Sequence, residues 1–299
     1  MSVESVLYDV KDHIATITFN RPHRMNAFIA PMYDDVIHTI DLAENDPDVR
    51  VVVFTGAGRT YCSGQDLDSG DKFGRQVEDM TQYRDRGGKM SLRIYNMRKP
   101  SIAAINGHAI GVGLSMTLPM DIRVVSKKAK VGFVFTRRGI INEACSSYFL
   151  PRLVGLSKAA ELVMTGRTFL AEEEASSGLF TYCVVPEMVL EKAYSIAHEI
   201  AGQAAPVSVA LARALIYRNM SASHPMQAHE LESMCMFWTA RSADSQEGIS
   251  AFLEKRPPDW KLSSTTDMPP FYPWWPERGF RQEDPIKRTQ RLSHQRDRT

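Results

Sequence analysis

The sequence is poor in the features that mark several large classes of protein. Its 299 residues contain only four cysteines, at spacings that give neither a disulfide framework nor a zinc-binding pattern: Cys62, Cys145, Cys183 and Cys235. We therefore expect a reducing compartment and no bound metal. Lys and Arg number 36 against 35 Asp and Glu, so the net charge is +1. This balance gives no reason to expect a nucleic acid or an anionic membrane as partner.

Long apolar runs are also missing, and no segment approaches the ~20 residues of a membrane-spanning helix. The first residues, MSVESVLYDVKDH, lack the basic and apolar regions of a secretory signal. The last four, RDRT, are not a peroxisomal address of the Ser-Lys-Leu type. These absences predict a cytoplasmic protein without a membrane partner. The apolar fraction of 43% is normal for a globular enzyme of one large or two smaller domains.

Strand patterns and glycine turns alternate in the first half of the chain. Period-two alternation over residues 14–19 predicts a strand, and helical spacing over 33–40 predicts a helix. The apolar run 51–55 is typical of a strand buried on both faces. The polar segment 68–90 is either a mobile excursion that orders over a ligand or a solvated surface loop. A helix is predicted over 90–97.

The stretch from residue 100 to 155 is the centre of the sequence. A strand over 101–105 leads to the turn Gly111-Val112-Gly113 and then to a predicted helix over 114–118. Further strands are expected over 122–125 and 131–135, and Glu143 stands just before a helix start at 144–148. A glycine turn that feeds a helix exposes backbone N–H groups and lets a ligand approach the main chain. Such a turn suits a site where negative charge develops on oxygen.

The second half of the chain is predicted to be helical, and its end changes character. Apolar spacing predicts helices over residues 157–165, 189–201, 207–220, 228–241 and 245–254. From residue 256 onward prolines and aromatic residues accumulate, which excludes a helix. We expect this tail to lie as a strap across the protein's own surface or that of a neighbouring subunit, and its last dozen residues to be disordered.

Four motifs in a fixed order carry a family resemblance: Asn20-Arg21-Pro22 with Met25-Asn26-Ala27, Cys62-Ser63-Gly64-Gln65-Asp66-Leu67, Asn106-Gly107-His108-Ala109-Ile110-Gly111-Val112-Gly113, and Phe252-Leu253-Glu254-Lys255-Arg256. Over about residues 3–256 the chain resembles the crotonase (enoyl-CoA hydratase/isomerase) superfamily. The resemblance implies an α/β fold, a spiral of repeated β-β-α units followed by a C-terminal helical trimerisation region. We expect residues 1–200 to form the spiral core with the CoA and oxyanion sites, 201–256 the trimerisation region, and 257–299 a tail that is first Pro-rich and aromatic, then basic.

The resemblance also implies a substrate, an assembly and a set of site residues. The substrate is an acyl-CoA, with coenzyme A as part of the thioester and no permanently bound cofactor, and the protein forms homotrimers or hexamers. The thioester oxygen accepts backbone N–H bonds from Gln65 and Val112. Such donors contribute roughly 3–4 kcal/mol each to an enolate. The implied CoA contacts are Arg24, Ala27, Ser63, Asp66 and Leu67, with Phe252 and Lys255 supplied by an adjacent subunit.

The expected reaction depends on which acids are present. Hydratases of this family use two glutamates, and the matching positions hold Ser115 and Phe135. Glu143 lies in the run Glu-Ala-Cys-Ser-Ser-Tyr, which resembles the peroxisomal-type Δ3,Δ2-enoyl-CoA isomerases with their single catalytic glutamate. One carboxylate suffices for a 1,3-proton shift. A hydratase, hydrolase or lyase of the same family remains an alternative, as does a non-catalytic scaffold.

The protonation state of Glu143 is left open by the sequence. Apolar neighbours would raise its pKa by desolvation, whereas the N-terminus of the following helix would lower it. Other candidates are weaker. Asp121 has the pattern of a structural acid, and His108 has no visible partner. A dinucleotide-binding site is disfavoured because the turn at Gly111 lacks the third glycine of the G-x-G-x-x-G motif.

Overall fold

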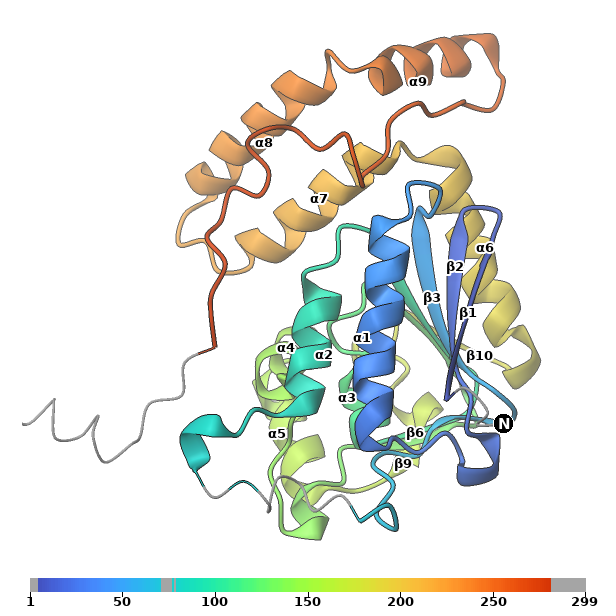
Figure 1. Cartoon of the computed structure of the whole chain (residues 1–299), viewed down its shortest axis with the longest axis vertical. Helices are drawn as coiled ribbons and strands as arrows, with labels where there is room; N and C mark the ends of the chain where they lie inside the picture. Colours follow the sequence, from blue (N-terminus) through green and yellow to red (C-terminus); the bar gives the residue numbers. More distant parts are fainter. Residues whose placement is uncertain (1–4, 71–76, 78, 281–299) are drawn as a thin grey trace, which may run out of the picture.

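Two β-sheets form the body of the protein in the computed structural model, which describes residues 5–70, 77 and 79–280 (Figure 1). The larger sheet has the spatial order β1-β2-β3-β5-β7-β10, with β1 Val6–Lys11, β2 Ile14–Phe19, β3 Val51–Gly56, β5 Ser101–Ile105, β7 Ile122–Ser126 and β10 Tyr182–Val184. The smaller sheet has the order β4-β6-β8-β9, with β4 Thr60–Cys62, β6 His108–Ile110, β8 Lys130–Gly132 and β9 Phe169–Leu170.

Successive chain segments wind through both sheets. The pairs β3-β4, β5-β6 and β7-β8 each place one strand in the larger and one in the smaller sheet, and within each sheet these strands are parallel. Helices follow the three pairs: α2 Arg86–Tyr95, α3 Val112–Ser115 and α4 Ser146–Val154, with α5 Leu156–Thr165 directly after α4. This arrangement confirms the predicted spiral of β-β-α units.

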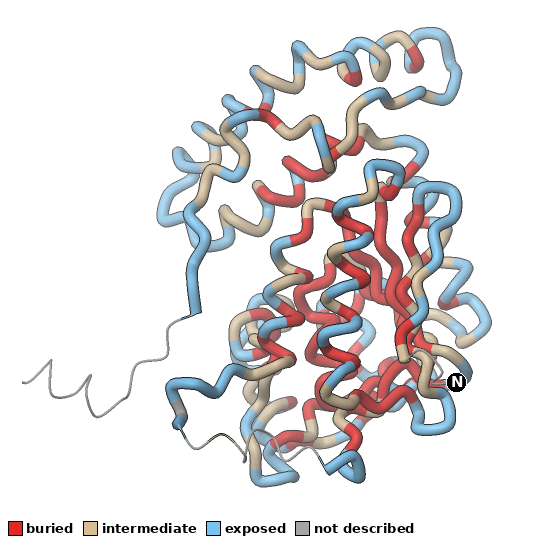
Figure 2. The backbone as a smooth tube through the Cα atoms, viewed as in Figure 1, coloured by how far each residue is buried: buried red, intermediate tan, exposed pale blue. Residues whose placement is uncertain are grey.

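Helices cover both faces of the larger sheet, because side chains alternate between the faces of a strand. Val51, Val53 and Ile102 face α6 Val189–Gln203 and pack with its Ala193. Residues of the opposite parity, such as Val52, Phe54, Ala103 and Ile105, join the larger core under α1 Ala30–Asn45 and α2. Figure 2 shows the resulting buried layer running through the body. The continuous apolar run of β3 thus has the predicted burial on both faces.

Three further helices stand beyond the body: α7 Pro206–Asn219, α8 Pro225–Thr239 and α9 Ala243–Glu254. The chain after α9 returns along α7 and α8, as Figure 1 shows. A small apolar cluster joins helix and tail residues: Val207, Leu211, Cys235, Trp238, Leu262, Met268, Phe271, Tyr272 and Trp274. The aromatic tail is therefore a strap on the protein's own surface, one of the two predicted arrangements. Its last dozen residues lie outside the described part.

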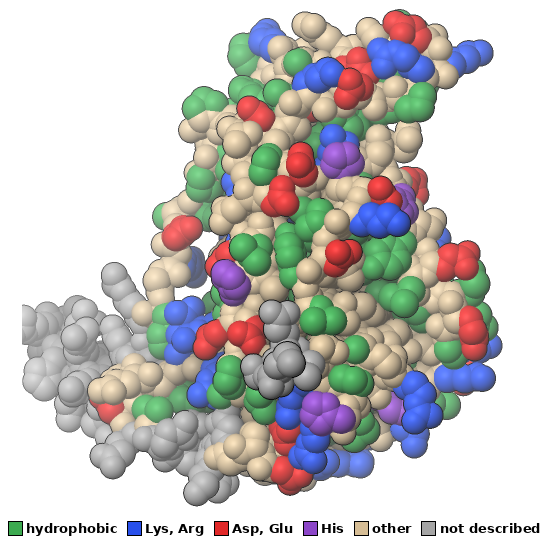
Figure 3. Space-filling view, turned by 45° about the vertical axis from the view of Figure 1, so that its right-hand side comes forward, with side chains coloured by type: hydrophobic (Ala, Val, Ile, Leu, Met, Phe, Trp, Pro, Cys, Tyr) green, Lys and Arg blue, Asp and Glu red, His purple; other side chains and the backbone are tan. Residues whose placement is uncertain are grey.

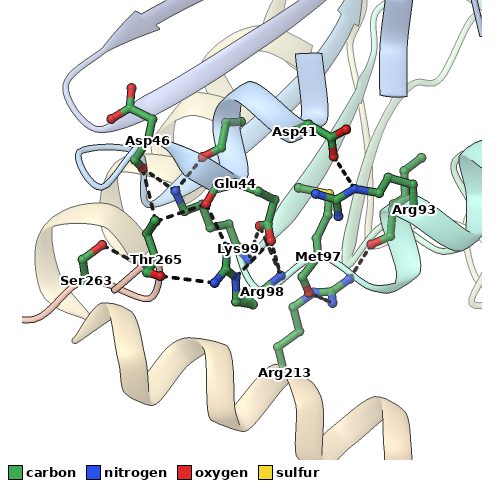
Figure 4. A network of polar contacts seen from close by, with 12 residues as sticks. Asp41, Glu44, Asp46, Arg93, Met97, Arg98, Lys99, Arg213, Ser263 and Thr265 are labelled. Atoms are coloured by element: carbon green, nitrogen blue, oxygen red, sulfur yellow. Dashed lines mark hydrogen bonds and ion pairs between the residues drawn. The ribbon is translucent and has the colours of Figure 1, made fainter. Parts of the chain in front are cut away.

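A polar network ties this strap and α7 to the body (Figure 4). The carboxylate of Glu44, near the end of α1, accepts bonds from the backbone N–H groups of Arg98 and Lys99 at 3.1 Å. Arg98 also donates to the carbonyl of Thr265 in the tail at 3.3 Å. Arg213 of α7 pairs with Asp121 at 2.9 Å and donates to carbonyls at the end of α2, so Asp121 has the structural role that its pattern indicated.

Some predicted elements have other bounds. The strand expected over 131–135 ends at Gly132, because its neighbour β6 turns away at Gly111 and leaves no ladder partner. The helix expected from 144 begins at Ser146, because Ala144 and Cys145 both have φ of 56°, in the left-handed region. The helix expected over 114–118 is α3, and β1 was not predicted.

The polar segment 68–90 ends in a helix rather than a loop. α2 begins at Arg86, four residues before the predicted start at residue 90, because Asp85 caps it. Residues 71–76 and 78 lie outside the described part. In the described chain no single helix is long and apolar enough to cross a membrane, and only the bent pair Pro186–Gln203 and Pro206–Asn219, with 116° between its halves, has that length and composition.

Candidate active site

Two glycine turns lie side by side at one edge of the smaller sheet. Strands β4 and β6 are parallel, with Cys62 opposite Ala109, and each runs directly into a turn. Gly64 has φ of 103° and Gly111 has φ of 56°, values that glycine adopts readily. A Cβ built on Gly111 would lie only 4.0 Å from the Cα of Gly64. The structure therefore brings together the two turns that the sequence analysis singled out.

Gln65 and Val112 follow these turns. Val112 is the first residue of α3, and the first N–H groups of a helix have no acceptor within it. Gln65 is paired with Phe28 in a bridge, and its side-chain oxygen accepts a bond from the Tyr33 hydroxyl at 2.8 Å. Both predicted oxyanion positions thus line one cavity of about 710 Å³.

The carboxyl group of Glu143 lies between α2 and α3 in the wall of this cavity. Ser115, one turn along α3 from Val112, donates a hydrogen bond of 2.5 Å to Oε1. On the other side, Oε2 occupies the space beside Gly87, where a Cβ would lie 1.7 Å from it. Ser115, which the resemblance matched to a glutamate of the hydratases, thus presents a hydroxyl that contacts Glu143.

Burial dominates the protonation of Glu143. Its pKa is raised from 4.5 to about 8, first by desolvation and second by the negative charge of Asp85, while the Ser115 hydrogen bond lowers it. A carboxyl group with a pKa of about 8 is mostly protonated at neutral pH. Of the two opposed influences that the sequence left undecided, desolvation is the stronger.

Asp85 was missed by the sequence analysis. It is the N-cap of α2 and also accepts a bond from the N–H of Ala144 at 3.0 Å. An aspartate just before an apolar helical pattern is a recognisable start signal. The signal was overlooked because residues 68–90 were read as one loop.

The other lining residues give the cavity a mixed character. Phe135, at the second hydratase position, is buried and stands 3.8 Å from a Cβ built on Gly111. Cationic and apolar side chains complete the wall: Arg84, Arg86, Lys89, Arg138, Val77, Val134, Ile140 and Ile141. Within the described residues no group of three His, Cys, Asp or Glu side chains could hold a metal ion.

Two of the predicted CoA contacts, Ser63 and Leu67, line the cavity together with Gln65. The neighbouring Asp66 is buried and holds Arg24 at 3.0 Å and Arg21 at 3.1 Å. These guanidinium groups keep the pKa of Asp66 below its usual range, with Arg24 the larger influence. Arg24, Ala27 and Asp66 thus support the turn next to the cavity rather than lining it.

Phe252 and Lys255 stand apart from this cavity. Both lie at the end of α9, at the far end of the molecule from α3 in Figure 1. The Phe252 side chain is 82% exposed and lines a second, shallower groove with Trp260. A single chain therefore does not bring these two predicted contacts to the other five.

The chain is similar to known proteins in both sequence and fold. The sequence model of the family described as enoyl-CoA hydratase/isomerase matches residues 9–263. The enoyl-CoA hydratase ACTT3 of Alternaria alternata is 45% identical over 83% of this chain and 82% of its own. The 1,2-epoxyphenylacetyl-CoA isomerase of Escherichia coli is 31% identical over 86% and 98%. A crystal structure of a probable enoyl-CoA hydratase/isomerase from Mycobacterium abscessus superposes with a TM-score of 0.79 at 31% identity, covering 87% of this chain and 99% of that one. The chain therefore belongs to the enoyl-CoA hydratase/isomerase family, in the crotonase superfamily.

Proposed function

We propose that this acyl-CoA enzyme is an enoyl-CoA isomerase that shifts a proton between C2 and C4 with Glu143 as its single acid–base group. The observation that carries the proposal is the position of the Glu143 carboxyl group, in the same cavity as both glycine turns. Of the described residues that line the cavity, Asp85 is the second acid, and its oxygens accept three backbone N–H bonds. Glu143 is the carboxyl group left to move a proton.

The proposed mechanism follows from this arrangement. A 3-enoyl-CoA binds with its thioester oxygen at the N–H groups of Gln65 and Val112. Ionised Glu143 takes a proton from C2, and the negative charge moves to the thioester oxygen as a dienolate. Preorganised backbone donors stabilise this oxyanion. Glu143 then returns the proton to C4, giving the 2-enoyl-CoA, and no water is consumed. Coenzyme A enters and leaves as part of the substrate.

The raised pKa has two consequences for this chemistry. A carboxylate with a pKa of about 8 is a stronger base than an ordinary one, which favours proton removal from carbon. Only the ionised form can act, however. We therefore expect kcat/KM to rise with pH through about 8 and then to level off.

Hydration is the second candidate, and the names of two relatives favour it. ACTT3 is named an enoyl-CoA hydratase, and a protein of Rhodobacter capsulatus that is 34% identical is named a probable enoyl-CoA hydratase. In such a reaction Glu143 would take a proton from water as its oxygen attacks C3, and would return that proton to C2. The same cavity would then need room for an ordered water beside Glu143.

One experiment separates the two reactions. The purified protein, its Glu143→Gln variant and a matched control, Glu161→Gln on the exposed face of α5, are each mixed with a 3-enoyl-CoA and with a 2-enoyl-CoA. Products are identified by mass spectrometry and by the absorbance of the conjugated thioester. Conversion of the 3-enoyl substrate without a change of mass, lost only in Glu143→Gln, supports the isomerase.

Addition of one water mass to the 2-enoyl substrate, without isomerisation of the other, would replace the isomerase by a hydratase. Thioester binding without turnover of either substrate would contradict both and favour the non-catalytic scaffold. The Glu161→Gln protein should behave as the wild type throughout, because its carboxyl group is in the α5 surface ion pairs and not in the cavity.

A further inference from the structure

Asp85 connects two parts of the active site that are distant in sequence. As the N-cap of α2, its Oδ1 accepts the N–H of Gly87 at 3.2 Å and its Oδ2 accepts the N–H of Gly88 at 2.6 Å. Capping of this kind is an ordinary role for aspartate. The same Oδ2, however, also accepts the N–H of Ala144 at 3.0 Å. One carboxylate therefore holds both the start of α2 and the residue after Glu143.

The held loop needs such a restraint. Ala144 and Cys145 both have φ of 56°, a conformation that side-chain-bearing residues adopt at some cost. This bend precedes α4 and directs Glu143 back toward α2 and α3. Without the bond from Ala144 to Asp85, the loop would lose the contact that fixes its distance from α2.

The first turn of α2 also provides the surface against which Glu143 rests. A Cβ on Gly87 would lie 1.7 Å from the Oε2 atom of Glu143 and 3.3 Å from the Cβ of Ala144. Glycine at this place leaves the space that the carboxyl group fills. Asp85, two residues earlier, then places a negative charge next to that carboxyl group.

Among the other described side chains around Glu143, no second carboxylate accompanies Asp85. Charged and titratable side chains of the described residues reach Glu143 or its cavity from α1, β4, the segment just before α2, α2 itself, the 3₁₀ turn Thr136–Arg138 and the loop before α4. They are Tyr33, Cys62, Tyr83, Arg84, Asp85, Arg86, Lys89, Arg138 and Cys145. Asp85 is the acid of this set. Its oxygens accept three backbone N–H bonds, which tie Asp85 to α2 and to the loop before α4.

We propose that Asp85 is a positioning residue for Glu143, because its carboxylate clamps the Ala144 loop to the start of α2 and stands beside the Glu143 carboxyl group. For the isomerase reaction this inference rests on the proposed function. The direction of the Glu143 pKa agrees with it, because the charge of Asp85 is the second cause of the rise. A nearby like charge disfavours ionisation and so strengthens the base that is formed.

Two substitutions separate the charge from the cap. Asp85→Asn removes the charge and leaves one carbonyl oxygen for the backbone, whereas Asp85→Ser keeps a hydroxyl that caps α2 but is too short to reach Ala144. Asp41→Asn is the matched control, because Asp41 is a half-buried carboxylate of α1 that accepts a bond from Arg93 of α2 at 2.6 Å and does not line the cavity.

The first readout is independent of the substrate. The protonated Glu143 carboxyl group is followed by infrared difference spectroscopy over pH, with its band assigned by its loss in Glu143→Gln. We expect the midpoint to fall by about one pH unit in both Asp85 variants and to stay unchanged in Asp41→Asn. The second readout is the pH profile of isomerisation, where kcat should fall on the order of 10–100-fold with little change in KM.

An unchanged midpoint together with wild-type kcat in Asp85→Ser would overturn the proposal and leave Asp85 as a helix cap alone.

The failures of the two proposals are distinguishable. If the wild type isomerises but the titration midpoint of Glu143 in the Asp85 variants equals that of the wild type, the positioning role fails and the isomerase stands. If no isomerisation occurs but the midpoint shifts, the positioning role stands and the reaction is another one. Should Asp85→Asn fail to fold, Asp85→Ser alone decides, because it keeps the cap of α2 while it removes both the charge and the bond from Ala144.

Discussion

The body of the protein and the helical region of α7–α9 differ in how completely they bury their own apolar surface. Within the body, β3 and β5 are buried along their whole lengths, and helices cover both faces of their sheet. In contrast, α8 buries a single residue, Cys235, and α9 buries only Asp244 and Ala251. In Figure 3, hydrophobic and charged side chains are mixed on the surface of the upper part of the molecule.

Large apolar side chains remain exposed on these helices: Met236 at 68%, Phe237 at 63%, Phe252 at 82% and Leu253 at 72%. Exposed apolar surface of this density marks an interaction site. We propose that α8 and α9 assemble with other copies of the chain, as a homotrimer or a dimer of trimers. The body forms its cavity within one chain, whereas under this proposal the helical region covers its apolar surface with a partner. Phe252 and Lys255 would reach a neighbouring cavity only in such an assembly.

The largest expected effect lies in the body. Glu143→Gln should lower turnover roughly 10²–10⁴-fold, because the amide cannot take a proton. The same substitution should stabilise the fold at alkaline pH. Since the folded-state pKa of Glu143 is raised to about 8, its contribution to stability is present at low pH and is lost as pH rises from about 4.5 through 8.

Thermal melts of the wild type and Glu143→Gln over pH 5 to 9 measure this second effect. The variant should melt several degrees higher at pH 9 and nearly together with the wild type at pH 5. If the variant is less stable than the wild type at every pH, burial of the ionised Glu143 carboxylate does not destabilise the fold.

The next largest effect should lie in the helical region. Phe237→Asp combined with Leu253→Asp places charges in the exposed apolar surface and should dissociate the assembly, measured by light scattering. If the neighbour supplies Phe252 and Lys255 to the CoA site, KM should rise at least 10-fold, while the circular dichroism melt of the body changes little.

Met164→Asp is the control for that pair, because Met164 is 77% exposed on α5. It should leave the assembly intact. A wild-type protein that is monomeric and fully active would contradict the proposed assembly, since neither the body nor the helical region would then need a partner.

Features of the site that depend on neighbouring residues in the sequence could be predicted, whereas those that depend on residues distant in the sequence could not. The turns at Gly64 and Gly111 were predictable because a strand, a glycine turn and a following helix are local patterns. The pairing of these turns required the parallel register of β4 with β6. The pKa of Glu143 could not be predicted, because it depends on Gly87 and Asp85, which are more than 50 residues away in the chain and meet Glu143 only through packing.

The fold shows the same division. The long helices were predicted to within a few residues. The start of the helix at Ser146 was placed two residues too early, because Ala144 and Cys145 form a left-handed bend and Ala144 is bonded to the distant Asp85. The exposed face of β1 hid its alternation, since four of its six residues are exposed. Tertiary contacts decided these cases over local preference.

A smaller effect is expected from Ser115→Ala, which tests how the Ser115 hydroxyl affects the protonation of Glu143. Its hydroxyl bonds the Glu143 carboxylate at 2.5 Å and lowers the pKa of that group. Without it the pKa should rise further, so the ascending limb of the pH profile moves to higher pH and activity at pH 7 falls about 3–10-fold. Activity at pH 9 should be nearly recovered. An equal loss at every pH would indicate that Ser115 acts by orientation alone.

The smallest effect should lie where the tail strap meets α7. The guanidinium group of Arg218 stands 3.9 Å from the ring centre of Trp275 and donates to the Asn96 side chain at 2.8 Å. Cation–π contacts at exposed sites are worth about 0.5–1 kcal/mol, so Trp275→Ala should lower the free energy of unfolding by about that amount and leave turnover unchanged. A double-mutant cycle with Arg218→Gln isolates the pair, and its coupling energy should account for most of the Trp275→Ala effect. A coupling near zero would mean that Trp275 contributes through its edge-on contacts with Tyr272 and Trp274, and that the strap holds itself together rather than being held by α7.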